Sequence, residues 1–504
     1  MVVTYRNNRL FPALIIAACI AALFFLIDPS IENYGNVKTQ QLHPQHADHS
    51  HEDAPPPLAQ APPPPPPPPS QSPVSRPPVA GGFVAQQDDD VLLIMKTGGT
   101  SMWKRLLVHL TTTLAPERVH PSNMVIYSDM AETVGPFEIV DVFANMSDAV
   151  KASEDFHHYR AQPEYRDHNA YVEAAGVEGD DWGPPGGWVI DKYKFIPLMR
   201  HAGEQWPKAK WYVYMEDDTY LFLPSVKQYL ARFDASEKHY LGSYAAKTGV
   251  VFAHGGAGFA LSRGAWEAVF NKKPSSSSSG SGGEGKEEVK RLEDEYHQYA
   301  TDHCCGDQVL AKALHDNGVS FGENGGDEKF VWGFNPLVHW AFPFSRYNWC
   351  SPLLSWHKVH NRDVAQYFAL ENRWDFASKP LLHRDFFNEL VLPRVREPKQ
   401  WWDNRAELFE VTSANQAWGA KPEGSKFDEG KWKMGWESVE ACEAACRGWE
   451  ACVSWTYVED LCKMDDKVTL GQGYAPDMSQ RKTSLMHTSG WLPERMEAWL
   501  CDWS

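Results

Sequence analysis

The chain has 504 residues, of which 43% are hydrophobic, and its formal net charge at pH 7 is −18. This length and apolar content suffice for more than one hydrophobic core, so two or three folded modules are expected. Acidic residues outnumber basic ones by 66 to 48. Because phosphate backbones attract basic surfaces, this balance argues against nucleic acid as the partner.

The first segment that stands out is the uncharged apolar run over residues 10–27, which is just long enough to span a bilayer. Arg6 and Arg9 precede it and Asp28 follows. By the positive-inside rule, residues 1–9 are therefore a cytoplasmic tail, and everything after Asp28 is lumenal or extracellular. A cleaved signal peptide is the alternative, but no small-residue cleavage site stands directly after the run. An uncleaved transmembrane signal-anchor is predicted.

Residues 28–88 are rich in proline and histidine and contain an unbroken proline run over 62–69. Such a composition cannot form a core, and the prolines favour polyproline II, a semi-rigid spacer. The histidines between His43 and His51 could bind metal, but a solvated stem is the favoured interpretation.

Cysteine usage agrees with a compartment outside the cytosol. Apart from Cys19 in the predicted anchor, the cysteines are even in number, and an oxidising lumen would let all of them pair. They are Cys304, Cys305, Cys350, Cys442, Cys446, Cys452, Cys462 and Cys501. Asn145 opens an N-glycosylation sequon, which is consistent with a lumenal location.

The first folded unit is predicted to start at residue 91. An apolar run over 91–95 reads as a strand, the glycine-containing turn 96–100 follows, and a helical pattern runs on to Leu110. Strand, turn and helix in this order are the first unit of a nucleotide-binding α/β fold. The turn has neither the dinucleotide nor the P-loop spacing, so it is compatible with a nucleotide without being diagnostic.

The most informative stretch is 211–222, in which an apolar aromatic strand runs into Glu216, Asp217 and Asp218 before apolar residues resume. Three adjacent carboxylates repel one another and need a compensating cation if they are buried. Carboxylate oxygens suit Mn²⁺ or Mg²⁺. The stretch alone leaves a metal site and a solvated acidic turn equally open.

Later motifs add further candidates. The glycine-rich stretch 254–262 lies between two apolar runs, where backbone could approach a ligand closely or adopt positive φ. Residues 273–286 are rich in serine and glycine and are predicted to be a flexible insertion. Asp307 stands at the start of an apolar helix and could be a helix cap or a functional acid. His357 lies in a short strand-like run, where a core histidine is the more common case.

The character of the chain changes near residue 431. Cys442 and Cys446 are spaced to share one face of a helix, and Cys452 and Cys462 follow. A unit too small for a large core needs such covalent links. Zinc is the competing interpretation, but the spacing contains no CxxC pair.

Taken together, the motifs resemble glycosyltransferase family 31, within it the core 1 β1,3-galactosyltransferase and Fringe-like enzymes of fungal type. The similarity extends over residues 91–365, and a weaker resemblance to PAN/apple domains covers 425–470. The matching pieces are Trp211 with Glu216–Tyr220, Gly255–Ser262, Gly306–Asp307 with Leu310–Ala311, Asn335–Pro336, and Cys350 with Ser355–His357 and Val359.

The resemblance implies an α/β GT-A fold, with a Rossmann-like half that binds a UDP-sugar and a second half that binds the acceptor. It implies a GT-A domain over 89–400, a small disulfide-stapled α+β apple-like domain over 425–470 and a tail over 471–504. By the same resemblance, Cys442 pairs with Cys462 and Cys446 with Cys452. The partners of the other cysteines stay open.

The resemblance also implies roles at the site. The family motif is Asp-x-Asp, whose last acid maps to Asp218, the expected Mn²⁺ ligand together with His357. Its first acid is replaced here by Glu216, a longer carboxylate that could reach the ribose or a metal-bound water. Asp217 is expected to have a supporting role in the acidic motif, and Asp307 maps to the general base.

Further residues are expected around the donor and acceptor. Lys96, Thr97 and Gly98 are expected to line the nucleotide, and Gly255 and Gly256 to bring backbone against the donor sugar. Trp340 and Trp356 could each stack on a sugar or pack in the core. The sequence leaves these two interpretations open.

The predicted activity is inverting, metal-dependent transfer of galactose from UDP-galactose to a glycan or glycoprotein, forming a β1,3 linkage. Such an N-acetylgalactosaminide β1,3-galactosyltransferase would be a type II Golgi membrane protein with a lumenal catalytic domain. Two alternatives remain: transfer of an N-acetylhexosamine from another UDP-sugar, or an inactive module that binds carbohydrate or protein. Donor choice depends on a few contacts to sugar hydroxyls, which the sequence does not resolve. A homodimer is left open.

Overall fold

The computed structural model describes residues 85–88, 90–167, 186–271, 291–323, 332–414, 426–474 and 485–501. The chain divides into two units, 1–75 and 76–504, and all of these residues belong to the second. The predicted tail, anchor and most of the stem lie outside the described residues, as does the predicted insertion 273–286. Within the described part, no helix combines the length and apolar character that crossing a membrane requires.

An eight-stranded mixed sheet forms the centre of the first folded half, in the order β11-β7-β10-β5-β1-β2-β4-β3. Strands β1, β2, β4 and β5 are parallel to their neighbours in this set, whereas β10 runs antiparallel to β5 and β7. This arrangement fits a Rossmann-like α/β fold. The strands are β1 (Val91–Lys96), β2 (Met124–Ser128), β3 (Glu132–Val134), β4 (Phe137–Asp141), β5 (Trp211–Glu216), β7 (Tyr240–Gly242), β10 (Phe259–Ser262) and β11 (Gly322–Glu323).

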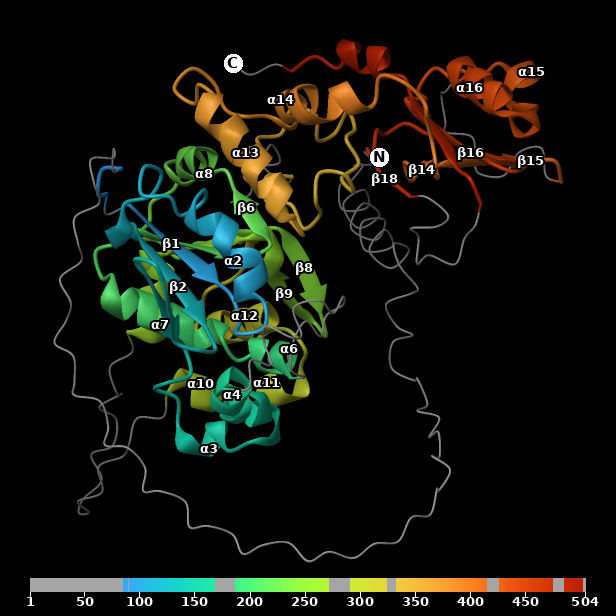
Figure 1. Cartoon of the computed structure of the whole chain (residues 1–504). Coiled ribbons are helices and arrows are strands. Elements are labelled where there is room, and N and C mark those ends of the chain that lie inside the picture. The colour runs from blue at the N-terminus through green and yellow to red at the C-terminus, as the bar shows by residue number, and fades with distance from the viewer. Residues whose placement is uncertain are drawn as a thin grey trace, which may run out of the picture. The chain divides into compact units, whose positions relative to one another are not determined.

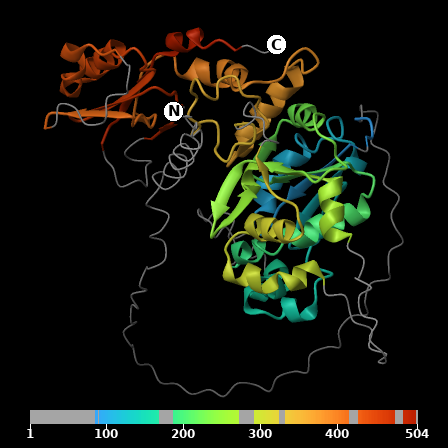
Figure 2. The same cartoon turned by 180° about the vertical axis from the view of Figure 1, so that it is seen from behind.

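Both faces of the sheet are covered by helices, which explains why β1 is buried along its whole length. Side chains alternate between the faces, so Leu92 and Ile94 enter one core while Leu93 and Met95 enter the other. The first core contains α7 (Phe195–Gln205), α9 (Arg263–Phe270) and α12 (Gly306–Asp316). The second contains α2 (Met102–Leu110) and α8 (Leu223–Leu230). Figures 1 and 2 show the sheet and the helices around it in two opposite views.

The predicted helical segments are shorter or more interrupted than their apolar patterns indicate. The apolar positions over 191–203 predict one helix, but α6 (Gly187–Asp191) ends at residue 191 and α7 begins at Phe195. The charged segment 287–299 likewise predicts one helix, whereas its described residues form α10 (Leu292–Glu295) and the start of α11 (His297–Asp302). In α2, Trp103 and Leu107 are 48% and 43% exposed, while Leu106 is fully buried. The apolar pattern of α2 is therefore wider than the stripe that contacts the sheet.

A third, aromatic core surrounds the antiparallel pair β6 (Thr219–Leu221) and β12 (Ser355–His357). Trp356 is fully buried there and packs edge-on against Phe342, so for this residue core packing is confirmed. Trp340 is partly buried, and the Arg405 guanidinium lies over its ring at 5.4 Å. Helices α13 (Asn361–Arg373) and α14 (His383–Phe386) follow β12 in the chain.

The C-terminal part is built on a five-stranded antiparallel sheet covered by α16 (Val439–Gly448). Its strands are β13 (Lys399–Gln400), β19 (Thr488–Trp491), β16 (Ser454–Val458), β17 (Leu461–Asp465) and β15 (Phe409–Thr412). The sheet thus draws on residues outside the predicted 425–470 range on both sides. Side chains that include Trp491 and Trp499 enter the aromatic core, so the C-terminal part packs directly on the segment that carries β12.

Four disulfides are present among the described residues. The implied pairs Cys442–Cys462 and Cys446–Cys452 are confirmed. The cysteines whose partners were open pair as Cys304–Cys305 and as Cys350–Cys501. The latter bond links the segment before β12 to the C-terminal part of the chain.

Candidate active site

A polar pocket of about 370 Å³ lies at the carboxyl ends of β1 and β5, the edge at which ligands bind in open α/β sheets. Every predicted site residue except Gly255 lines this pocket. The predicted site residues that line the pocket come from the ends of β1, β5, β9 (Val250–Ala253) and β12 and from the start of α12.

Three side chains in the pocket are arranged as a metal-binding group. Ligand atoms of Glu216, Asp218 and His357 all lie within 4.8 Å of one another. The β6–β12 pair produces this proximity, because His357 is the register partner of Thr219, the residue that follows Asp218. The His357 Nε2 atom lies 3.4 Å from Asp218 Oδ1.

The protonation of the imidazole suits a metal ligand. His357 Nδ1 lies 3.0 Å from the carbonyl oxygen of Pro336, which can only accept, so Nδ1 carries the proton in the neutral ring. Its Nε2 lone pair then faces Asp218, as in metal-bound histidines. Asp218 Oδ1 is buried and has no hydrogen-bond partner among the described residues. This orphaned oxygen and the mixed oxygen and nitrogen donor set fit a divalent cation such as Mn²⁺.

The electrostatics of the group keep Asp218 ionised. Burial alone would raise its pKa, but the neighbouring His357 and the Arg105 guanidinium outweigh it and hold the pKa well below the ordinary value. Arg105 Nη1 lies 3.1 Å from Asp218 Oδ2 and 3.4 Å from Asp217 Oδ1. Burial lowers the pKa of His357, but Asp218 outweighs this effect and the pKa is raised.

Glu216 belongs to the same group, although the sequence placed it only with the nucleotide-binding residues. It ends β5 directly opposite Lys96 at the end of β1, and its carboxylate lies 3.3 Å from the Lys96 ammonium. The Tyr214 hydroxyl donates to Glu216 Oε1 at 3.0 Å. Glu216, which stands where the resemblance implies an Asp, therefore still provides a carboxylate at the site, and a lysine and a tyrosine contact it.

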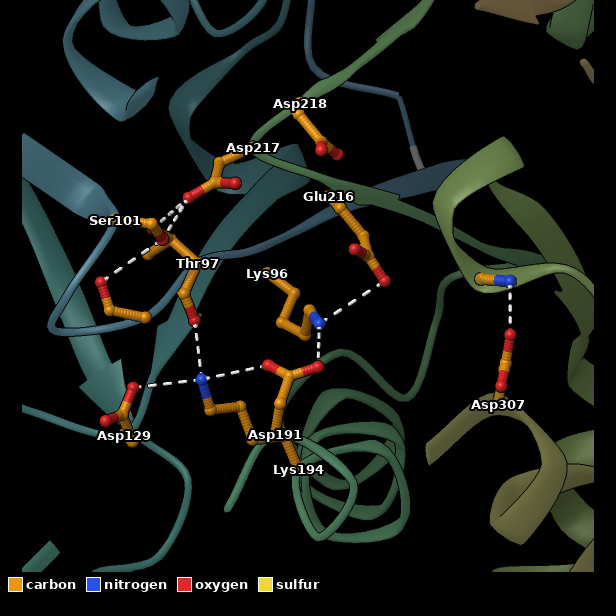
Figure 3. A network of polar contacts seen from close by, with 12 residues as sticks. Lys96, Thr97, Ser101, Asp129, Asp191, Lys194, Glu216, Asp217, Asp218 and Asp307 are labelled. Atoms are coloured by element: carbon orange, nitrogen blue, oxygen red, sulfur yellow. Dashed lines mark hydrogen bonds and ion pairs between the residues drawn. The ribbon is translucent and has the colours of Figure 1, made fainter. Parts of the chain in front are cut away.

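Asp217 turns away from the metal-binding group toward the glycine-containing turn (Figure 3). Its Oδ2 accepts hydrogen bonds from the hydroxyls of Thr97 at 2.6 Å and Ser101 at 2.7 Å. The middle acid of the triplet thus connects the acidic motif to the turn that follows β1. Ser101 was not among the predicted site residues, and a hydroxyl in a turn is too common a feature to single it out.

A buried ion network underlies the pocket and was also missed. Lys96 pairs with Asp191, and Lys194 lies 3.1 Å from Asp191 and 2.9 Å from Asp129 (Figure 3). Lys194 also donates to the carbonyl oxygen of Thr97 at 3.0 Å. The one available signal was the pair of opposite charges, Asp191 and Lys194, inside an otherwise apolar segment.

Asp307 lies on the other side of Gly255 from the metal-binding group. The helix cap of α12 is Cys305, so Asp307 does not serve as the cap. Its Oδ2 accepts the backbone N–H of Gly255 at 2.7 Å. A Cβ atom built on Gly255 would lie 3.2 Å from Glu216 Oε1 and 3.3 Å from Asp307 Cβ. Burial raises the pKa of Asp307 above the ordinary value, which strengthens it as a base.

Gly256 is required by the histidine of the metal-binding group. A Cβ atom at this position would lie 2.2 Å from His357 Nε2, so the imidazole packs directly on the glycine backbone. We expect Gly256→Ala to push His357 away from Asp218 and to weaken Mn²⁺ binding by about tenfold or more. Titration followed by the electron paramagnetic resonance signal of free Mn²⁺ measures this.

Gly322→Ala is the matched control, because the added Cβ atom would meet nothing closer than 3.4 Å and the glycine lies on β11. Its Mn²⁺ affinity should equal that of the unmodified protein. An unchanged affinity in Gly256→Ala would contradict the assignment of His357 as a ligand.

Comparison with protein-family models matches residues 190–295 to the Fringe-like family. A search of curated proteins found no match. The matched stretch contains Asp191, the acidic triplet and Gly255–Gly256, and it ends before Asp307 and His357. Residues 190–295 are therefore Fringe-like, and the match points to a glycosyltransferase of the family 31 kind.

Proposed function

We propose that the protein transfers galactose from UDP-galactose to a glycan or glycoprotein acceptor, with inversion and with formation of a β1,3 linkage. One observation carries the proposal. A three-residue metal-binding group and a separate, partly buried carboxylate line one pocket, and Gly255, whose N–H donates to that carboxylate, lies between them. Inverting, metal-dependent transfer from a nucleotide sugar uses these two elements, the metal for the leaving diphosphate and the carboxylate for the acceptor hydroxyl.

Asp307 is the proposed general base. The acceptor hydroxyl attacks the anomeric carbon from the face opposite the nucleotide and passes its proton to a carboxylate oxygen of Asp307. The new bond joins the acceptor oxygen to the anomeric carbon as the bond from that carbon to the phosphate oxygen breaks. UDP leaves with the electron pair of the broken bond. The Gly255 N–H holds the carboxylate in place, and burial increases its basicity.

Glu216, Asp218 and His357 are the proposed cation ligands. Bound there, Mn²⁺ would offset the charge that develops on the departing diphosphate, for which the mechanism assigns no proton donor. Lys96 fixes the Glu216 carboxylate from the end of the neighbouring strand, and Asp217 ties the acidic motif to the turn after β1. These contacts hold the site in shape before substrate binds.

The proposed location is the Golgi lumen, with the protein anchored through residues 10–27 as a single-pass type II membrane protein. Disulfides at four places in the described chain support an oxidising compartment. Asn145 is exposed, as a glycosylated residue must be.

The test is a panel of UDP-sugars incubated with the purified lumenal region, Mn²⁺ and simple glycoside acceptors. We expect UDP release and a new β1,3-linked product with UDP-galactose, and loss of both when EDTA is added. Turnover of another UDP-sugar in place of UDP-galactose would overturn the donor assignment. Binding of acceptor without turnover of any donor would favour the inactive module.

A further inference from the structure

Lys358, the residue directly after His357, has an unusual backbone conformation. Its φ is +56°, in the left-handed region that residues with side chains seldom adopt and that is enriched at functional sites. The chain is fixed on both sides of it. His357 is paired in β12, and the Val359 N–H donates to the carbonyl oxygen of Asp218 at 2.9 Å. The lysine is therefore held, exposed, at the wall of the pocket.

Lys358 differs from the other basic side chains of the pocket. Each of those has a carboxylate partner within 4 Å: Lys96 and Lys194 with Asp191, Arg105 with Asp218, and Lys192 with Asp155. In the part of the chain that the structure describes, Lys358 has none.

The charge balance of the site indicates which ligand the ammonium group of Lys358 could bind. The ion pairs at the site form two groups, one around Lys96 and Lys194 and one around Arg105. Together they contain three cationic side chains and five carboxylates: Lys96, Arg105, Lys194, Asp129, Asp191, Glu216, Asp217 and Asp218. A divalent cation would only neutralise the net negative charge of these two groups. The diphosphate of a nucleotide sugar is doubly negative, so it would meet no surplus positive charge there. Lys358 is the pocket cation that remains to supply it.

We infer that Lys358 binds the diphosphate of the donor, with its ammonium pairing with phosphate oxygens beside the metal-binding group. The inference rests on the proposed function, since it needs a nucleoside diphosphate in this pocket. Because Lys358 adopts the left-handed conformation, it can stand directly after the ligand His357. His357 meanwhile stays paired in β12, and Val359 keeps its hydrogen bond to Asp218. The ligand class is a nucleoside diphosphate, recognised by charge rather than by its base.

The test compares Lys358→Asn with Lys358→Arg. Asparagine removes the charge but tolerates the left-handed backbone, whereas arginine retains the charge. With saturating Mn²⁺, we expect Lys358→Asn to weaken UDP binding by about tenfold or more and to leave the weaker binding of uridine, followed by NMR titration, unchanged. Lys358→Arg should bind UDP within about threefold of the unmodified protein. Lys208→Asn is the control, because Lys208 is exposed and does not line this pocket.

The outcomes separate this inference from the proposed function. If the unmodified protein binds no UDP in the presence of Mn²⁺, the proposed function fails. If it binds UDP and Lys358→Asn binds equally well, the lysine does not contact the diphosphate. The inference also fails if Lys358→Arg loses as much affinity as Lys358→Asn, or if Mn²⁺ affinity falls in parallel with UDP affinity.

Discussion

Asp307→Asn is expected to reduce sugar transfer by about a hundredfold to ten-thousandfold, with Mn²⁺ and UDP still bound. Asparagine has nearly the size of aspartate, and its carbonyl oxygen can still accept the Gly255 N–H that Asp307 accepts at 2.7 Å. It cannot take a proton from the acceptor hydroxyl. Single-turnover transfer and calorimetric titration with UDP, made on the same preparation, measure the two quantities.

The pH dependence of sugar transfer is a second test of Asp307 as the general base. Burial raises the pKa of Asp307, and only its ionised form can accept a proton. Activity should therefore fall as the pH drops through this raised pKa, at a higher pH than for an ordinary aspartate. The matched control is Asp302→Asn on the preceding helix, where the residue is exposed. Retention of most turnover by Asp307→Asn would place the base elsewhere.

Asp218→Asn and His357→Ala are each expected to abolish Mn²⁺-dependent UDP binding. Loss of a partner that merely orients a ligand weakens metal affinity by about tenfold to a hundredfold, and loss of a ligand itself should exceed that. In Asp218→Asn, the Arg105 guanidinium, which lies 3.1 Å from the carboxylate, would also remain with less negative charge to offset it. It would then repel the cation.

Calorimetric titrations with Mn²⁺, and with UDP at saturating Mn²⁺, test this expectation. His315→Ala is the control, since that histidine side chain is 74% exposed and lies near the end of α12. Unchanged affinity for Mn²⁺ and UDP in either ligand variant would refute the metal assignment. Glu216→Gln extends the series, because the structure brings a third carboxylate to the same group.

The local elements that carry the site could be predicted because their signals are local. The apolar runs that became β1 and β5 are buried along their length, and a strand of that kind is visible in sequence. The approach of His357 to Asp218 could not be derived from spacing, since it depends on the pairing of β6 with β12. It was expected only through the resemblance to a family, which supplied the long-range information.

The ion network below the pocket lay beyond sequence reasoning for the same physical reason. Lys96 and Glu216 meet because β1 and β5 are in a particular register, and Lys194 reaches Asp129 from a different element. The residues near Lys194 include its partner Asp191, but nothing there identifies the distant partner Asp129. The interruption of the predicted helix before Phe195 belongs to the same case, because the lysine in that turn is held by contacts to Thr97 and Asp129.

The Cys350–Cys501 disulfide has a consequence for the order of events during synthesis. Its two residues are 151 positions apart, so if the chain enters an oxidising lumen as proposed, Cys350 arrives there well before its partner exists. During that interval β12, α13 and all five strands of the C-terminal sheet are synthesised. Cys350 must meanwhile remain a thiol or pair wrongly with an earlier cysteine, such as Cys304 or Cys305. Chains arrested in this interval in which Cys350 has not mispaired should therefore react with a thiol-alkylating reagent at Cys350, whereas finished chains should not.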